Sequence, residues 1–196
     1  MIYTMAMIYT NKIKDAVFFA SKAHIDQKRK ILEYPYISHP LSILFVVSQY
    51  TKDEDVLVSA ILHDTVEDTD TSLDEIETNF GKRVRDMVDI LSEDNTILDP
   101  QVKKQKQLER FKNASHDVLL IKLADIIVNF CDITLVLNNH TKEEYFEIFG
   151  SNLKDKISGY DERILVIEKA WPENPLIEEV KIRFDDYKNA LAKLDL

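Results

Sequence analysis

An apolar run that passes directly into a cluster of charged groups is the strongest constraint in this sequence. Residues 56–62 are almost entirely apolar, and His63, Asp64, Glu67 and Asp68 follow them. A helix that is apolar nearly all round belongs in a core, where a carboxylate is costly unless a metal ion or an opposite charge neutralises it. If the helix continues, the two later acids lie one turn beyond the histidine and the first aspartate. The stretch predicts either a metal site beside a proton-handling group or a capped helix end with solvated acids.

A second apolar segment, residues 118–137, carries an internal polar stripe. The polar residues are spaced by three, four and three positions, which places them on one face of a helix. They are Lys122, Asp125, Asn129 and Asp132. Because aspartate is seldom fully buried without a partner, Asp125 is a candidate member of a neutralised site.

His39 is a further polar candidate. It precedes Pro40, which suits the first position of a helix, so we expect the histidine at the mouth of that helix. A single histidine is more often a surface or satisfied core residue than a ligand. The whole set forms a mixed nitrogen and oxygen group suited to Mn²⁺, Fe²⁺ or Zn²⁺. Its members are His39, His63, Asp64 and Asp125.

The low content of glycine and proline favours an all-helical chain. The 196 residues include three glycines and five prolines, too few for many strands and tight turns. The length suits one domain with a full core. We expect an all-α fold, a single bundle of about nine helices over residues 1–196. We interpret residues 1–10 as a start-site extension and residues 133–196 as C-terminal helices that complete the domain.

Capping signatures locate most of the expected helix starts. Serine or threonine followed by glutamate three positions later occurs at Thr51, Ser72 and Thr141, and Asp99-Pro100 is also typical of an N-terminus. The expected helices run over about 11–29 with Asn11 as cap, 41–49, from Thr51 past His63, from Ser72 to Gly81, over 84–91, from Asp99 through Phe111, over 118–137, from Thr141 to Ala170 with a break near Gly150 or Gly159, and from Asn174-Pro175 to the C-terminus.

Charge and composition narrow the expected partners. The net charge of −10 argues against a general nucleic-acid binder, although a local basic cluster could hold a small polyanion. The first ten residues lack the features of a signal peptide, and no stretch is long enough to span a membrane. The lone cysteine, Cys131, cannot form an internal disulfide and fits a reducing compartment. We expect a cytoplasmic protein with a small-molecule partner, no nucleic acid and no membrane; a homo-oligomer is left open.

Longer strings carry a family resemblance. The order H…HD…D, formed by His39, His63-Asp64 and Asp125, resembles the HD-domain metal-dependent phosphohydrolases. Other strings are similar to the RelA/SpoT-type (p)ppGpp hydrolase domain, in particular the stand-alone small alarmone hydrolases. They lie between about Ala16 and Asp132 and read R-K with P-Y-I-S-H-P (29–40), L-H-D-T-V-E-D-T (62–69), F-G-K-R-V (80–84) and I-K-L-A-D…N (121–129).

The resemblance implies a Mn²⁺-dependent enzyme that removes the 3′-pyrophosphate of (p)ppGpp to give GDP or GTP and pyrophosphate. The residues that it implies as ligands of one Mn²⁺ are His39, His63, Asp64 and Asp125. The acidic pair implied to orient and deprotonate the attacking water is Glu67 and Asp68. The residues implied to bind the nucleotide are Arg29, Lys30 and Asn129.

The chain departs from the family pattern in the expected nucleotide pocket. Residues 31–34 lack the usual glycine, and Ile126 and Cys131 stand where the family has basic residues. Two alternatives therefore stay open: an HD-family phosphatase of another nucleotide or dinucleotide phosphate, and a non-catalytic alarmone-binding module.

Three further residues have open roles. Lys103 and Lys104 either contact distal phosphates or belong to a solvated helix face. Tyr160 is a candidate for the ribose-stacking tyrosine of the family. The sequence also leaves open the regulators and the preference between tetra- and pentaphosphate.

Overall fold

The computed structural model describes residues 9–29, 34–150 and 153–194, which form helices and one isolated antiparallel bridge between Lys28 and Pro35. The all-α prediction is confirmed, with eleven helices in the described ranges against about nine expected. None of these helices is both long and apolar enough to cross a membrane. They are α1 (Asn11–Ala23), α2 (Ser38–Val47), α3 (Glu54–Leu62), α4 (Thr65–Asp68), α5 (Leu73–Phe80), α6 (Lys82–Leu91), α7 (Pro100–Lys112), α8 (His116–Leu137), α9 (Lys142–Phe149), α10 (Leu153–Ala170) and α11 (Ile177–Lys193).

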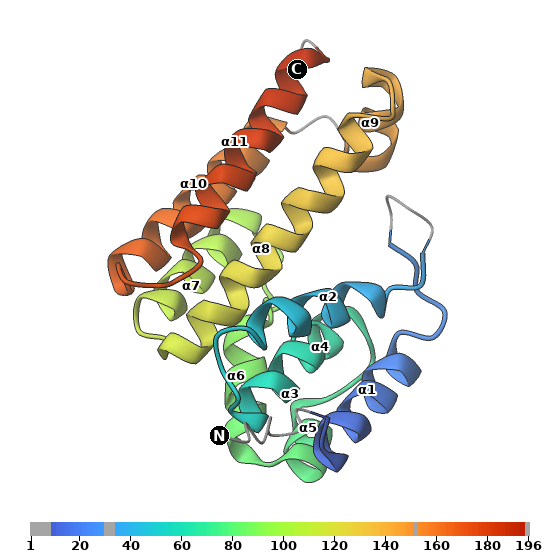
Figure 1. The fold of residues 1–196 in the computed structure, drawn as a ribbon, viewed down its shortest axis with the longest axis vertical. Helices are drawn as coiled ribbons and strands as arrows, with labels where there is room; N and C mark the ends of the chain where they lie inside the picture. The colour runs from blue at the N-terminus through green and yellow to red at the C-terminus, as the bar shows by residue number, and fades with distance from the viewer. Residues whose placement is uncertain (1–8, 30–33, 151–152, 195–196) are drawn as a thin grey trace, which may run out of the picture.

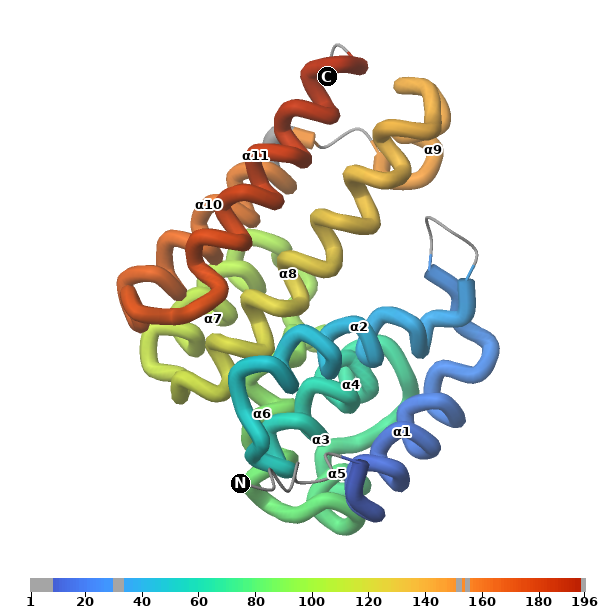
Figure 2. The backbone as a smooth tube through the Cα atoms, in the orientation of Figure 1, coloured from blue at the N-terminus to red at the C-terminus, as the bar shows by residue number. Residues whose placement is uncertain are grey.

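The 22-residue helix α8 is the central element of the fold. Figures 1 and 2 show it crossing the molecule, with α1 to α6 gathered toward its N-terminal half and α10 and α11 beside it. α2, α3 and α6 pack against it, and α11 runs along it, while α10 packs mainly on α7. A helix with so many apolar positions has to be surrounded by other helices. The buried side chains of the described residues accordingly form one cluster from Ile13 to Leu191.

Local capping signals set several helix starts as predicted. Ser72 and Thr141 each form both hydrogen bonds of a capping box with the glutamate three positions later. Asp99 caps α7, with Pro100 in its first turn. These caps satisfy backbone N–H groups that have no partner within the helix.

The first helix is shorter than predicted. Its cap is Thr10 rather than Asn11, and it ends at Ala23 rather than near Arg29. Beyond it the chain folds back on itself, and the N–H of Arg29 donates to the carbonyl of Tyr34 over 2.9 Å. Backbone groups paired in this way cannot join a helix, so Arg29 lies beside the antiparallel bridge of Lys28 and Pro35.

Two other helix starts are displaced by two residues or more. α2 begins at Ser38, before Pro40, because proline is tolerated within the first turn; His39 therefore lies inside that turn. α11 begins at Ile177 rather than at Asn174-Pro175. The asparagine side chain accepts the N–H two residues further on and forms a separate turn.

The capping box predicted at Thr51 and Glu54 is wrong. The cap of α3 is Asp53, whose carboxylate accepts the N–H of Asp55 over 3.1 Å. An ionised carboxylate is a stronger acceptor than a hydroxyl. The Thr51 hydroxyl instead accepts the N–H of Asp53, and the Glu54 carboxylate accepts a bond from Thr10 at the start of α1.

The helix that carries His63 is interrupted directly after it. α3 ends at Leu62, and α4 begins at Thr65, whose hydroxyl donates to the Leu62 carbonyl over 2.7 Å. The N–H of Asp68 donates to the carbonyl of Asp64 over 2.9 Å. The chain therefore bends between the histidine and the acidic pair instead of continuing as one helix.

Glycine ends two of the helices. Gly81 follows α5 with φ +90° and ψ 163°, and Gly150 follows α9 with φ +72° and ψ 172°. Both conformations are essentially restricted to glycine. The predicted break near 150 or 159 thus occurs at Gly150, whereas Gly159 lies within α10.

We expect Gly81→Ala to lower the free energy of unfolding by about 1–3 kcal/mol, because alanine is strained at this φ and ψ. Gly159→Ala is the matched control. Alanine is preferred in a helix interior by up to about 1 kcal/mol, and a Cβ at residue 159 would lie 3.6 Å from Arg163, an ordinary contact. Urea unfolding of both variants tests this, and equal effects would contradict it.

Candidate metal centre

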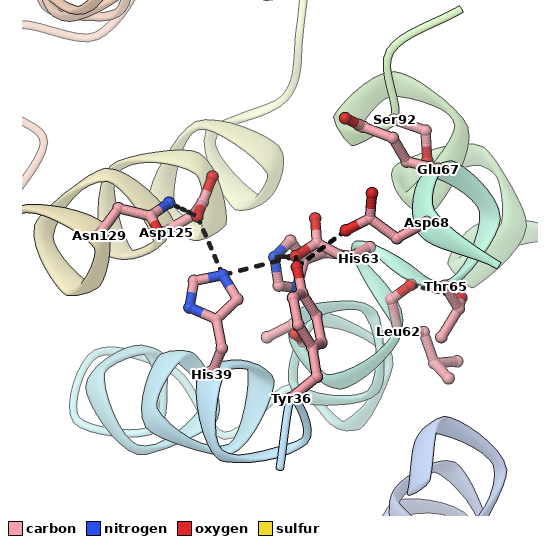
Figure 3. Close-up of polar contacts among 12 residues, drawn as sticks. Tyr36, His39, Leu62, His63, Thr65, Glu67, Asp68, Ser92, Asp125 and Asn129 are labelled. Atoms are coloured by element: carbon pink, nitrogen blue, oxygen red, sulfur yellow. Dashed lines mark hydrogen bonds and ion pairs between the residues drawn. The ribbon is translucent and has the colours of Figure 1, made fainter. Parts of the chain in front are cut away.

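Three buried side chains from three helices meet at one point. His39 comes from the first turn of α2, His63 caps the end of α3, and Asp125 lies within α8. One ligand atom from each lies within 4.8 Å of the others, and their exposed fractions are 2%, 2% and 6%. His39 Nε2 is 3.3 Å from Asp125 Oδ1 (Figure 3). Residues far apart in the sequence thus converge in the core.

Asp64 adjoins both imidazoles. Its Oδ2 lies 2.9 Å from Nε2 of His63 and 3.5 Å from Nε2 of His39. Burial opposes ionisation of this carboxyl, but the two histidines hold the pKa of Asp64 well below its usual value.

The tautomer of His63 fits a bound cation. His63 Nδ1 lies 2.9 Å from the carbonyl of Ala60 and therefore carries a hydrogen. Its Nε2 is buried and finds no hydrogen-bond partner among the described residues, although Asp64 lies beside it. In the neutral ring this nitrogen presents a lone pair toward a carboxylate, which is repulsive unless a cation lies between them. Carbonyl-oriented imidazoles of this kind are typical of metal ligands.

A proton on His63 can supply the positive charge beside Asp64 in place of a metal ion. Burial disfavours the imidazolium, but Asp64 and Asp125 outweigh it and raise the pKa of His63 to about 9. The group therefore attracts positive charge, whether a proton or a divalent ion. The donor set of two imidazoles and two carboxylates suits Mn²⁺, Fe²⁺ or Zn²⁺.

The neighbours of Asp125 on α8 hold its carboxylate in place. Lys122 donates to Oδ2 over 2.8 Å, and Asn129 donates to Oδ1 over 2.6 Å. Burial opposes ionisation, but Lys122 and the nearby histidines keep the pKa of Asp125 well below its usual value. Lys122 was not among the predicted site residues, although its place on the polar stripe of α8 was the signal for it.

The predicted acidic pair lies beside this group. Glu67 is partly buried, and its Oε2 accepts the backbone N–H of Glu93 over 2.7 Å. Burial is the main cause that raises the pKa of Glu67 to about 7. Asp68 is exposed and accepts a hydrogen bond from Tyr36. Figure 3 shows both carboxyl groups on the same side of the two histidines.

Tyr36 is a site residue that the sequence reasoning missed. Its hydroxyl donates to Asp64 Oδ2 over 2.6 Å and reaches Asp68 Oδ2 over 2.9 Å. Burial and the adjacent carboxylates raise its pKa far above the usual value, so it acts as a donor. The ring stacks on His24, with centroids 4.6 Å apart. Its position three residues before His39 in the P-Y-I-S-H-P string was the available signal.

The centre opens into a large cavity. A pocket of about 260 Å³ contains the acids and His39, and it adjoins a second cavity of about 1140 Å³. The larger cavity is lined by basic and aromatic side chains, which suits a large anionic ligand with a ring. Residues that line both include Arg29, Tyr36, Asn129, Tyr160 and Arg163.

Two of the three predicted nucleotide-binding residues lie together in this wall. Arg29 donates to the Asn129 side chain over 2.8 Å and forms an ion pair with Asp132 over 2.7 Å. Lys30 lies outside the described residues. Because Asn129 also bonds Asp125, a chain of hydrogen bonds links the cavity wall to the metal centre.

The three residues whose roles the sequence left open, Lys103, Lys104 and Tyr160, all line the larger cavity. The ammonium groups of Lys103 and Lys104 bond Asn95 and Glu162 respectively. Tyr160 lines both cavities and packs against Phe130, with ring centroids 4.7 Å apart.

The two departures at basic family positions have different consequences. Ile126 lines the small pocket and contributes hydrocarbon there. Cys131 is exposed and is absent from the linings of both cavities. Arg163, from α10, brings a guanidinium to the wall of both cavities, which no sequence pattern indicated.

Known proteins resemble the chain along most of its length. The family model of the HD domain matches residues 16–151. Human guanosine-3′,5′-bis(diphosphate) 3′-pyrophosphohydrolase MESH1 is 37% identical over 144 residues, which cover 69% of this chain and 79% of that protein. A protein of the same enzymatic name from Aquifex aeolicus is 35% identical over 196 residues, covering 91% of this chain and 27% of its own length.

Solved structures agree with this relationship. A structure described as a metazoan ortholog of SpoT that hydrolyzes ppGpp superposes with a TM-score of 0.74 at 26% identity, covering 93% of this chain and 96% of that one. The lmo0812 protein of Listeria monocytogenes shares the fold, with a TM-score of 0.67 at 23% identity, covering 78% of this chain and 97% of that one. The resemblance expected from the sequence is confirmed: the chain belongs to the HD-domain family, in the group that includes MESH1.

Proposed function

We propose that this protein is a guanosine-3′,5′-bis(diphosphate) 3′-pyrophosphohydrolase. The observation that carries the proposal is the buried group of His39, His63 and Asp125, with Asp64 beside it, opening into a cavity lined by cations and aromatic rings. The names of its relatives support the same reaction. The contiguous core supports a single domain over the described residues, and the lone cysteine supports a cytoplasmic location.

One Mn²⁺ is the metal that we propose for the centre. Its ligands would be His39, His63, Asp64 and Asp125, a mixed nitrogen and oxygen set that this ion accepts. When bound, it would polarise the 3′-pyrophosphate and lower the pKa of a water molecule. Lys122 and Asn129 orient the Asp125 carboxylate, and the Ala60 carbonyl orients the His63 ring, so the ligands are held before the metal arrives.

Glu67 and Asp68 are the residues that we propose for proton handling. A carboxyl with a pKa near 7 can take a proton from water at neutral pH. The N–H of Glu93 holds one oxygen of Glu67, and the hydroxyl of Tyr36 orients Asp68. We propose that Arg29, Lys30 and Asn129 bind the nucleotide, and that the face of Tyr160 packs against its sugar.

The direct test is a hydrolysis assay of the purified chain with ppGpp, with and without Mn²⁺. The expected products are GDP and pyrophosphate, formed only with the metal. A panel of other nucleotides and dinucleotide phosphates serves as the comparison. Turnover of another nucleotide but not of ppGpp would contradict the proposed substrate, and binding of ppGpp without turnover under all metal conditions would indicate a binding module instead.

Asp64→Ala should lose bound metal and activity together, because it deletes a proposed ligand. The matched control is Asp70→Ala, a nearby exposed aspartate. Metal content by elemental analysis and ppGpp turnover are the two measurements. Full activity in the Asp64 variant would exclude this residue from the metal centre.

Glu67→Gln should keep the metal and lose most of the turnover. General-base assistance is typically worth about 10²–10⁴-fold in rate, and the amide cannot accept the proton. Elemental analysis and single-turnover kinetics measure the two effects separately. If the amide variant turns over at the wild-type rate, another group is the base.

The rate should rise with pH through the ionisation of Glu67. The pKa is raised to about 7 by burial, and the base works in its deprotonated form, so kcat/KM increases as the pH passes the pKa and is constant above it. A bound dication lowers the pKa of nearby acids, so the inflection should lie at or below about pH 7. The test compares the pH dependence of kcat/KM in wild type and Glu67→Gln. The rise with pH should disappear in the variant.

A further inference from the structure

Arg163 is a cation in the catalytic cavity that lies outside the HD-domain match. The match covers residues 16–151, whereas Arg163 belongs to α10, which packs on α7. Its side chain lines both the 260 Å³ pocket and the 1140 Å³ cavity. It therefore stands at the junction between the proposed metal centre and the space for the rest of a ligand.

The guanidinium of Arg163 is held in this position by two hydrogen bonds. Nε donates to the Gln107 side chain over 3.0 Å, and Nη2 donates to Glu93 over 3.1 Å. Gln107 is buried on α7, so it is a fixed anchor for the arginine. Nη1 lies beside Gly159, one turn earlier on α10. Only about a fifth of the arginine side chain is exposed.

The other two cations of the small pocket pair with aspartates. Lys122 pairs with Asp125 over 2.8 Å, and Arg29 pairs with Asp132 over 2.7 Å. The carboxylate that faces Arg163 is Glu93, which itself lines both cavities. An anionic ligand entering the junction can therefore compete for this guanidinium without removing a partner from the metal centre.

The pocket also lacks a basic residue where one was expected. Ile126 contributes hydrocarbon to its wall, so this position of α8 supplies no positive charge to a phosphate there. Arginine suits phosphate binding, because its planar fork can bond two phosphate oxygens at once, whereas lysine is a point charge.

We propose that Arg163 binds the 3′-pyrophosphate of the substrate and holds the pyrophosphate until it is released. This inference rests on the proposed function, and it assigns a substrate-binding role to a residue on α10. The same contacts allow a purely structural role, in which Arg163 only holds Glu93 and, through the N–H of that residue, Glu67. The experiment has to separate the two roles.

The test measures binding of pyrophosphate and of GDP to the metal-loaded protein by calorimetry, together with kcat/KM for ppGpp. Loss of one charge-assisted hydrogen-bond pair should weaken pyrophosphate binding roughly 10- to 100-fold in Arg163→Gln. GDP binding and metal content should be unchanged, and kcat/KM should fall by a similar factor. Arg163→Lys should lie between wild type and the glutamine variant.

Two further variants serve as controls. Arg183→Gln removes an arginine from α11 that pairs with Glu179, and it should leave all three measurements unchanged. Glu93→Gln removes the carboxylate partner of Arg163. It should leave pyrophosphate binding equal or tighter if the arginine contacts phosphate.

The outcomes distinguish this inference from the proposed function. Wild-type pyrophosphate binding in Arg163→Gln would overturn the inference, and so would equal weakening of pyrophosphate and GDP. If Glu93→Gln weakens pyrophosphate binding as much as Arg163→Gln does, the inference is overturned in favour of the structural role. If the wild-type chain fails to hydrolyse ppGpp, the proposed function fails, while the calorimetric comparison still decides whether Arg163 binds a diphosphate.

Discussion

The concentration of charge inside the core is the constraint on which the rest of the structure depends. His39, His63 and Asp125 are buried between α2, α3 and α8, and Asp64 lies beside them at the wall of the small pocket. Ionised groups in such a place are destabilising unless they are paired. Lys122 supplies one positive charge from within α8, and the remaining demand is for a proton or a metal ion. This group is therefore a candidate site for a metal ion.

The interruption between α3 and α4 separates the histidine from the acidic pair. His63 caps the end of α3, and Asp64 caps the start of α4. Glu67 and Asp68 then lie on a separate short helix, in contact with Glu93 and Tyr36 respectively. Both acids line the small pocket, on the same side of the two histidines.

The sequence predicted some local signals correctly, whereas the capping box at Thr51 was wrong. The capping boxes at Ser72 and Thr141 and the polar stripe of α8 depend on neighbours within one helical turn, and each is present. The end of α1 was predicted wrongly because backbone pairing across the turn beyond it decides where Arg29 lies. Arg163 was missed because only the packing of α10 on distant elements brings it to the pocket, whereas the place of Tyr36 in the P-Y-I-S-H-P string was a signal that went unused.

The cavity wall and the candidate metal ligands come partly from different helices, and this separates the effects of substitutions in the two places. α10 supplies Tyr160 and Arg163 to the wall, but no candidate metal ligand, and it rests mainly on α7. Substitutions between these two outer helices can therefore change the cavity wall without altering the side chains of the candidate metal centre. The hydrogen bonds from Arg163 to Glu93 and from the N–H of Glu93 to Glu67 are the route by which such a change would reach the acidic pair.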